Sequence, residues 1–184
     1  SGLAYGIDIC AHRAALQNNL STVAVLAHGL DRIYPHTHRN TAVEMLENGA
    51  LITEFMSETN PDKHNFVKRN RIVAGMADAV VVIESGEKGG SLITADIGNS
   101  YFREVFALPG RTTDKMSAGC NKLIFDNKAV LLRSADDFIA HMGWETHKKI
   151  AQPKQKELFL NLTDDEEKIF NALNGNDGKQ VNTL

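Results

Sequence analysis

A glycine-rich segment near the middle of the chain has the composition of an anion-binding turn. Residues 87–95 have the sequence Glu-Lys-Gly-Gly-Ser-Leu-Ile-Thr-Ala and follow the most strand-like run of the chain. Two adjacent glycines let the backbone turn tightly and approach a ligand without Cβ clashes. The free N–H groups at the start of the following helix favour negative charge, so the segment predicts a phosphate site. We expect this site to comprise Gly89, Gly90 and Ser91, with Lys88 beside them.

A second segment, residues 63–71, gathers positive charge around an aromatic ring. It contains four Lys or Arg residues and no acidic residue. Cations hold a nucleic-acid backbone, and an aromatic ring stacks on bases whatever their sequence. The alternative is a solvated helix face, which is the usual role of a charge run, but the lack of alternating acids favours binding. The candidate nucleic-acid contacts are Lys63, Phe66, Arg69, Asn70 and Arg71.

Other residues with chemical potential favour structural roles. The three histidines of residues 28–39 follow the spacing H-x7-H-x-H, which matches no common zinc pattern. A loop that lines the ligand site, with Tyr34 and Pro35 as a rigid turn, is the preferred interpretation. Glu54 and Glu84 end predicted strands and could act as acid or base, but such carboxylates more often bond loop backbone. We therefore expect no catalytic residue, no metal and no cofactor.

Strands and helices alternate around these segments. Short apolar runs rich in β-branched residues, such as 22–26 and 79–84, are typical of strands buried in a parallel sheet. The alternation predicts an α/β fold with a doubly wound, mainly parallel sheet and flanking helices, in which ligands bind beyond the carboxyl ends of the strands. The predicted helices are 8–19, 41–47, 66–76, 91–100, 121–125 and 134–142, and the predicted strands are 22–26, 50–54, 79–84, 105–108 and 129–132.

The composition is that of an ordinary globular protein. The chain has 184 residues, is 42% apolar and 23% charged, and carries a net charge of −3. The negative charge argues against an indiscriminate nucleic-acid binder, although a local basic stripe could still bind phosphates. No apolar run is long enough to span a bilayer, and no signal peptide is recognisable. Two cysteines do not make a disulfide framework, which favours a reducing cytoplasm.

The two ends of the chain predict a fragment of a longer protein. Ser1 and Gly2 lead into the first predicted helix with no preceding strand, although an α/β unit normally has one. Thr163 and Glu166 form a capping-box pattern before a short helix that could not be stable alone. We expect residues 1–144 to form one domain that is truncated at its N-terminus, 145–162 to be a linker, and 163–184 to begin a second, truncated domain.

Several of these segments, in this order, resemble the DNA-processing protein A family, also called DprA or Smf. The resemblance covers residues 1 to 140 and implies a Rossmann-like domain that binds single-stranded DNA. It also implies loading of the RecA recombinase onto that DNA in natural transformation, homodimerisation, and a winged-helix-like domain beginning at Thr163. The matching pieces are Ser1-Gly2-Leu3-Ala4-Tyr5-Gly6-Ile7-Asp8 with His12, Gly29-Leu30-Asp31-Arg32-Ile33-Tyr34-Pro35, Glu54, Phe66 with Arg69-Asn70-Arg71-Ile72-Val73-Ala74-Gly75, Gly90-Ser91-Leu92-Ile93-Thr94-Ala95, and Pro109-Gly110.

The resemblance carries the site with it. It implies a basic DNA pocket lined by Lys63, Phe66, Arg69, Asn70 and Arg71, with Lys88 and the Gly90-Ser91 turn near a phosphate. His28 stands where the family usually has a small residue, and Lys88-Gly89 replaces the commoner Lys-Ser. The family's upstream Gly-Ser-Arg loop, whose arginine contacts DNA, would precede Ser1.

Two other functions remain open on the sequence alone. The first is a nucleotide or nucleoside-phosphate hydrolase resembling the phosphoribohydrolase (lysine-decarboxylase-like) group, which also binds phosphate at a glycine-rich helix start. Its P-G-G-x-G-T-x-x-E signature would fall at residues 88–96, but Leu92 stands where a glycine belongs and no glutamate follows in register. The second is a dinucleotide-dependent oxidoreductase, which the missing G-x-G-x-x-G fingerprint disfavours. A non-catalytic DNA-binding protein is the preferred hypothesis.

Overall fold

The computed structural model describes residues 1–144, 163–166 and 168. Residues 1–144 form one compact unit and residues 145–184 another. The predicted linker at 145–162 and most of the predicted second domain at 163–184 lie outside the described residues. The fold described below is that of residues 1–144.

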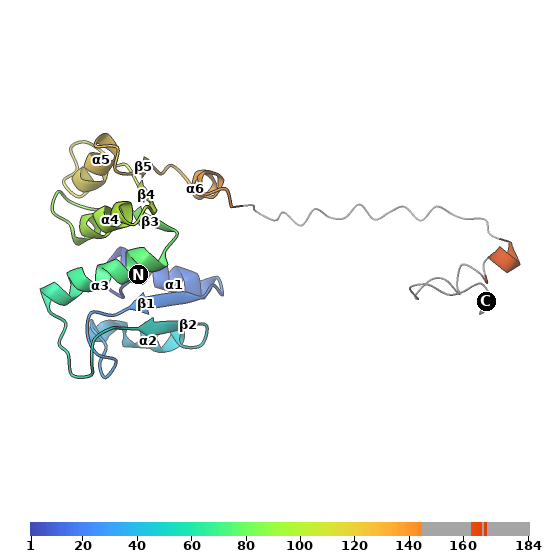
Figure 1. The fold of residues 1–184 in the computed structure, drawn as a ribbon, viewed down its shortest axis with the longest axis horizontal. Coiled ribbons are helices and arrows are strands. Elements are labelled where there is room, and N and C mark those ends of the chain that lie inside the picture. The colour runs from blue at the N-terminus through green and yellow to red at the C-terminus, as the bar shows by residue number, and fades with distance from the viewer. Residues whose placement is uncertain (145–162, 167, 169–184) are drawn as a thin grey trace. The chain divides into compact units, whose positions relative to one another are not determined.

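Helices and strands alternate along residues 1–144, as Figure 1 shows. The helices are α1 (Ile7–Gln17), α2 (Arg39–Met45), α3 (Lys63–Met76), α4 (Gly90–Ser100), α5 (Ala118–Phe125) and α6 (Ala135–His141), with a 3-10 turn η1 (His36–His38). The strands are β1 (Thr22–Val25), β2 (Gly49–Ile52), β3 (Ala79–Val82), β4 (Glu104–Ala107) and β5 (Val130–Leu131). The predicted α/β fold of parallel strands flanked by helices is confirmed.

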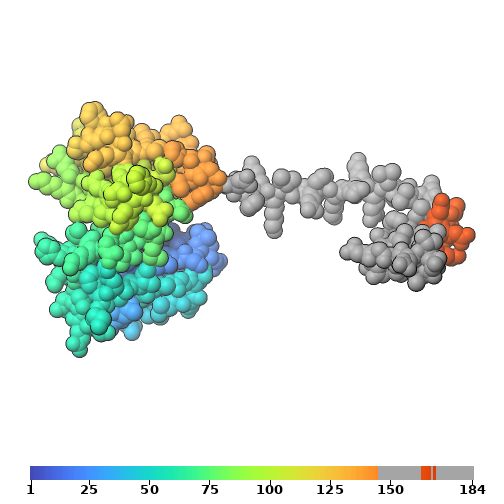
Figure 2. Space-filling view, in the orientation of Figure 1, coloured from blue at the N-terminus to red at the C-terminus, as the bar shows by residue number. Residues whose placement is uncertain are grey.

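The strands form two parallel sheets rather than one continuous sheet. In the first, β1 pairs with β2, and in the second the order is β3-β4-β5. Helices α1 and α2 pack against each other and against β1 and β2, while α3 and α4 pack against each other between the two sheets and their loops. In Figure 2 the green side chains of α3 and α4 lie next to each other across the middle of this face.

Each sheet has its own apolar core. One core surrounds β1 and includes the buried residues Leu3, Ile9, Ala24, Leu26, Ala42 and Met45. The other surrounds β3 and β4 and includes Ala74, Val80, Val82, Ala95, Val105, Ala107, Cys120 and Leu123. No helix among the described residues has the length and apolar character needed to cross a bilayer.

The start of α1 differs from the sequence prediction. The helix begins at Ile7, and its N-cap is Gly6, whose φ of 81° suits a residue without a Cβ. Asp8, predicted as the cap, instead turns its carboxylate back to accept hydrogen bonds from the N–H groups of Gly2 (3.0 Å) and Ala4 (3.4 Å). Asp8 therefore fixes the path of the first residues of the chain rather than the end of the helix.

Other boundaries confirm or correct the sequence analysis. Helix α3 begins at Lys63, three residues before the predicted start, because Asp62 is already extended (ψ 155°) and serves as the N-cap. Ser134 caps α6 as predicted, since its hydroxyl accepts from the N–H of Asp137 at 3.1 Å. Cys10, expected in the core, is exposed, because α1 buries Ile9 and His12 on the opposite side.

The predicted capping box at the start of the second unit is present in one of its two arms. The carboxylate of Glu166 accepts hydrogen bonds from the N–H of Thr163 (2.9 Å) and from its hydroxyl (2.8 Å). These bonds lower the pKa of Glu166. The rest of this predicted helix lies outside the described residues.

A buried histidine makes the stability of the fold depend on pH. Burial, the largest cause, lowers the pKa of His12 to about 4, well below its ordinary value. Its Nδ1 bonds the hydroxyl of Thr22 at 2.7 Å, and the residue is 1% exposed. Because the unfolded chain binds a proton near pH 6.5 and the folded one only near pH 4, the stability held above pH 6.5 falls as the pH drops through this window, by at most about 1.4 kcal/mol per pH unit.

We expect His12→Asn to flatten this pH dependence. Urea unfolding at several pH values between 7 and 4 would measure it, with the exposed His64→Asn as the control that keeps the slope of the unmodified chain. Equal slopes in the unmodified chain and the His12→Asn variant would contradict this role of His12.

Candidate nucleic-acid interface

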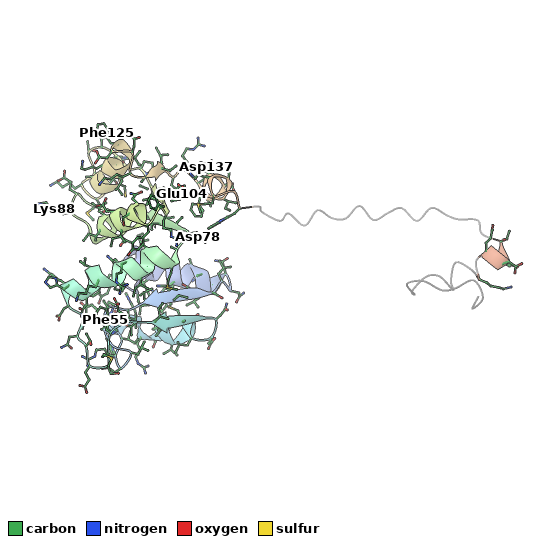
Figure 3. All side chains as sticks on the ribbon, in the orientation of Figure 1. Phe55, Asp78, Lys88, Glu104, Phe125 and Asp137 are labelled. Atoms are coloured by element: carbon green, nitrogen blue, oxygen red, sulfur yellow. The ribbon has the colours of Figure 1, made fainter. Side chains whose placement is uncertain are left out.

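Both predicted binding segments lie at the edge where the strands end. Figure 3 shows Phe55, which follows β2, and Lys88, which follows β3, on one side of the molecule. Asp78 and Glu104, at the starts of β3 and β4, lie on the opposite side. Parallel α/β folds bind ligands beyond the carboxyl ends of their strands, so the two segments occupy the expected edge.

A cavity of about 520 Å³ lies between α3, α4, β3 and the first residues of the chain. We call its end at the first turns of α3 and α4 the cleft. Of the predicted site residues, five line the cavity: Phe66, Arg69, Asn70, Gly90 and Ser91. The fold thus brings together two segments that are separated by some twenty residues of sequence.

The glycine-rich turn has the geometry of an anion site. Helix α4 begins at Gly90, and Gly89 is its N-cap, with no side chain closing the helix end. The N–H of Gly89 is bonded to the carbonyl of Gly86 (3.2 Å), whereas those of Gly90 and Ser91 have no acceptor within the described residues. These two donors and the positive end of the helix dipole make the turn suitable for a phosphate oxygen.

The two glycines of this turn differ in what a side chain would meet. A Cβ on Gly89 would overlap the hydroxyl of Ser85, a 4% exposed residue that donates to the carbonyl of Gly86. A Cβ on Gly90 would meet no atom within 4 Å. Gly89 is therefore required by close packing, whereas Gly90 is not.

We expect Gly89→Ala to weaken phosphate or oligonucleotide binding by about tenfold, because Ser85 must give up its hydrogen bond and the turn must shift. Gly90→Ala is the matched control, and it should keep the folded turn and the affinity within about twofold. Fluorescence anisotropy with a labelled oligonucleotide would compare them. Equal affinities for the two variants would contradict a binding role for this turn.

Aromatic side chains from two distant segments meet beside the cleft. The ring centroids of Tyr34 and Phe66 are 6.2 Å apart, and Tyr34 is 47% exposed. The loop that carries Tyr34 is held near the start of α3, since Arg32 donates to the side chain of Asn60 at 2.7 Å. Sequence analysis expected this loop to line the site but did not single out Tyr34, whose ring contact depends on the tertiary fold.

Arg69 has a structural role that the sequence did not reveal. The residue is 6% exposed, and its Nη1 donates to the carbonyl of Val25 at the end of β1. Its Nε donates to the side-chain oxygen of Asn70 at 3.1 Å, and a Cβ on Gly2 would overlap its guanidinium. Burial lowers the pKa of Arg69, and the charge of Asp8 opposes this effect. Its predicted contact with DNA stays a prediction beside this bracing role.

The remaining predicted cations occupy different positions. Lys63 and Lys88 are exposed, one in the first turn of α3 and the other just before α4, and neither forms an ion pair with the described residues. Arg71 lies outside the cavity and forms an ion pair with Glu54. Glu54 is thus engaged as a structural partner, which matches the expectation that it does not serve as an acid or base.

The histidine-rich segment bonds backbone rather than gathering ligands. The Nδ1 atoms of His28 and His38 lie 2.8 Å from the carbonyl oxygens of Gly29 and Leu3, respectively. Within residues 1–144 and the few described beyond them, no three His, Cys, Asp or Glu side chains are close enough to hold a metal ion.

Comparison with known proteins gives a consistent family. The family model described as DNA recombination-mediator protein A matches residues 1–143. The putative DNA processing protein DprA of Mycobacterium tuberculosis is 37% identical over 184 residues, which is all of this chain and 47% of that protein. Protein Smf of Escherichia coli is 41% identical over 148 residues, or 80% of this chain and 39% of that protein. The chain thus spans about half the length of these relatives, or less.

Two solved structures share the fold. DNA processing protein A from Streptococcus pneumoniae superposes with a TM-score of 0.69 at 40% identity, covering 76% of this chain and 49% of that one. The protein of the same name from Helicobacter pylori, whose structure is described as giving insights into its single-stranded DNA binding mode, has a TM-score of 0.70 at 30% identity. It covers 77% of this chain and 63% of that one. These are DNA-processing proteins rather than catalytic enzymes, and the chain belongs to their family, the DNA recombination-mediator protein A family.

Proposed function

We propose that this chain binds single-stranded DNA in the cleft between the first turns of α3 and α4. The observation that carries the proposal is the convergence of Phe66 and Asn70 from α3 with Gly90 and Ser91 from α4 on one cavity. Lys63 and Lys88 stand at the starts of the same two helices. An aromatic ring, free backbone donors and cations at one edge are what a single strand requires.

The binding is independent of base sequence. Phosphates contact Lys88 and the Gly89-Gly90-Ser91 turn, where the helix dipole adds to the positive field. Lys63 extends this field along the start of α3, and a base stacks on Phe66. The predicted contacts through Arg69, Asn70 and Arg71 belong to the same proposal, with Arg69 also holding Val25 in place.

The larger role is that of a recombination mediator in the cytoplasm. The bound strand is delivered to the RecA recombinase in natural transformation, as the family resemblance implies. The protein acts as a homodimer, and exposed apolar side chains on the second sheet and its helices support this part of the proposal. They include Phe102 (97% exposed), Phe125 (85%) and Leu131 (44%).

The alternative nucleotide hydrolase finds little support at the cavity. Among the residues that line it, Asp8 is the one carboxylate, and its oxygen already accepts from the N–H groups of Gly2 and Ala4. A general base needs a free carboxylate within reach of the substrate. We therefore expect no turnover of nucleoside monophosphates.

The experiment that tests DNA binding is anisotropy of labelled oligo-dT with Phe66→Ala. Loss of one base–aromatic stack, about 1–3 kcal/mol, should weaken binding by about 5- to 150-fold. The matched control is Val67→Ala, because Val67 is the next residue on α3, is 45% exposed, and does not line the cavity. We expect the control to bind within about twofold of the unmodified chain.

Two outcomes would contradict the proposal. One is equal binding by the Phe66→Ala and Val67→Ala variants, which would place the DNA elsewhere. The other is an unmodified chain that binds no oligo-dT but hydrolyses a nucleoside monophosphate, which would favour the hydrolase.

A further inference from the structure

Strands β1 and β3 present unpaired edges to the same space. Each pairs on one side only, β1 with β2 and β3 with β4. Alternate residues of a strand direct their N–H and C=O groups to opposite edges. The carbonyl of Val82 accepts from the N–H of Leu108 on the β4 side (2.9 Å), so the N–H and C=O groups of Val81 face the open edge.

Ser1 already forms one rung of a ladder on the open edge of β1. Its amino group donates to the carbonyl of Val23 (3.3 Å), and its carbonyl accepts from the N–H of Val25 (2.8 Å). In a parallel ladder one residue bonds the two neighbours of its partner, which here is Ala24. Ser1 therefore lies where the last residue of a strand parallel to β1 would lie, and Figure 1 places the N-terminus between β1 and β3.

The cavity continues from Ser1 along the whole of β3. Away from the cleft its lining is small or aliphatic: Val73 and Ala77 of α3, Thr94 of α4, and Ala79 and Val81 of β3. Val81 is 38% exposed although it lies at the centre of its strand. An apolar slot bounded by two unpaired strand edges suits an extended apolar segment.

We propose that the polypeptide immediately preceding Ser1 forms a parallel strand in this slot. The strand pairs with β1 on one side and β3 on the other, and it joins the two sheets into one of order β2-β1-new strand-β3-β4-β5. The relatives have the length to supply it, since this chain spans 47% or less of the two named above.

The surroundings of the Ser1 amino group support this assignment. Burial lowers the pKa of this ammonium, and the nearby Arg69 guanidinium lowers it further, against the opposing charge of Asp8. A peptide N–H in the same place would make the same bond to Val23 without a charge to desolvate. The new strand would end at Ser1 and leave open the cleft formed by Phe66, Asn70, Gly90 and Ser91.

Hydrogen exchange followed by NMR tests the proposal. The 184-residue chain is compared with the same chain carrying the eight or so residues encoded before Ser1, a typical strand length. We expect exchange of the Val81 amide to slow by about 100-fold or more in the longer chain, because it gains a backbone acceptor. The amide of Val82 faces β4 in both proteins and serves as the internal control.

A proline at the residue directly before Ser1 sharpens the test. By alternation from Ser1, the N–H of that residue faces β3, and proline has no N–H to donate. We expect this variant to return the Val81 exchange rate to that of the 184-residue chain, while alanine at the same position keeps the protection.

Three results would overturn the proposal. The first is equal Val81 exchange in the shorter and longer chains. The second is protection that rises with protein concentration, which would give the slot to a second copy. The third is a gene that encodes no residue before Ser1.

Discussion

Replacing Arg69 with alanine is expected to lower the free energy of unfolding by about 3 kcal/mol. The guanidinium is buried and donates to the carbonyl of Val25, so its removal leaves a buried acceptor unpaired and a space beside Gly2. Asp8 also loses the cation whose charge it shares. Urea or thermal unfolding followed by circular dichroism would measure the change.

Arg71→Ala is the matched control for this experiment. Arg71 lies two residues further along α3, carries the same charge and is exposed, with an ion pair to Glu54 at the surface. Exposed ion pairs contribute about 1 kcal/mol or less, so this variant should unfold close to the unmodified chain. Similar losses of stability in both variants would contradict the bracing role of Arg69.

The comparison also separates two meanings of lost DNA binding. Arg69→Ala is expected to bind DNA poorly because β1 and the first residues of the chain shift, whatever direct contact its guanidinium makes. A variant such as Lys63→Ala removes charge from an exposed position without touching either core. Affinity losses at Arg69 are therefore interpretable only beside a measured unfolding curve.

The alternation of elements and the location of the site were predictable from sequence because both depend on local signals. Apolar runs define β1 and β3, and the Gly89-Gly90 pair marks the start of α4. The carboxyl-end edge follows from parallel topology, so the two binding segments could be expected to face the same space.

The roles of individual side chains were less predictable because they depend on contacts between distant segments. Arg69 appeared to be one of four equivalent cations, yet its position on α3 turns it toward the end of β1, where Val25 lacks a partner. Asp8 appeared to be a helix cap, but Gly6 takes that position and frees the carboxylate for Gly2. Neither contact is visible as periodicity or spacing within one segment.

The second large effect is expected in the salt dependence of DNA binding. If three to five phosphates are engaged, the logarithm of the binding constant for a single strand should fall with log salt at a slope of about −2 to −3.5. Raising salt from 50 to 200 mM should then weaken binding by about 20- to 100-fold. Fluorescence anisotropy with labelled oligo-dT at four or more salt concentrations would give the slope.

The Lys63→Ala/Lys88→Ala double variant should make this slope shallower by about 1.4, because each lost phosphate contact removes about 0.7. Lys122→Ala/Lys128→Ala is the matched control, since those lysines are exposed at the α5 and β5 end and pair with Asp126 and Asp96. Both double variants change the net charge by the same amount, so a difference between their slopes must come from local contacts. Equal slopes would mean that the overall field, rather than the two helix starts beside the cleft, holds the strand.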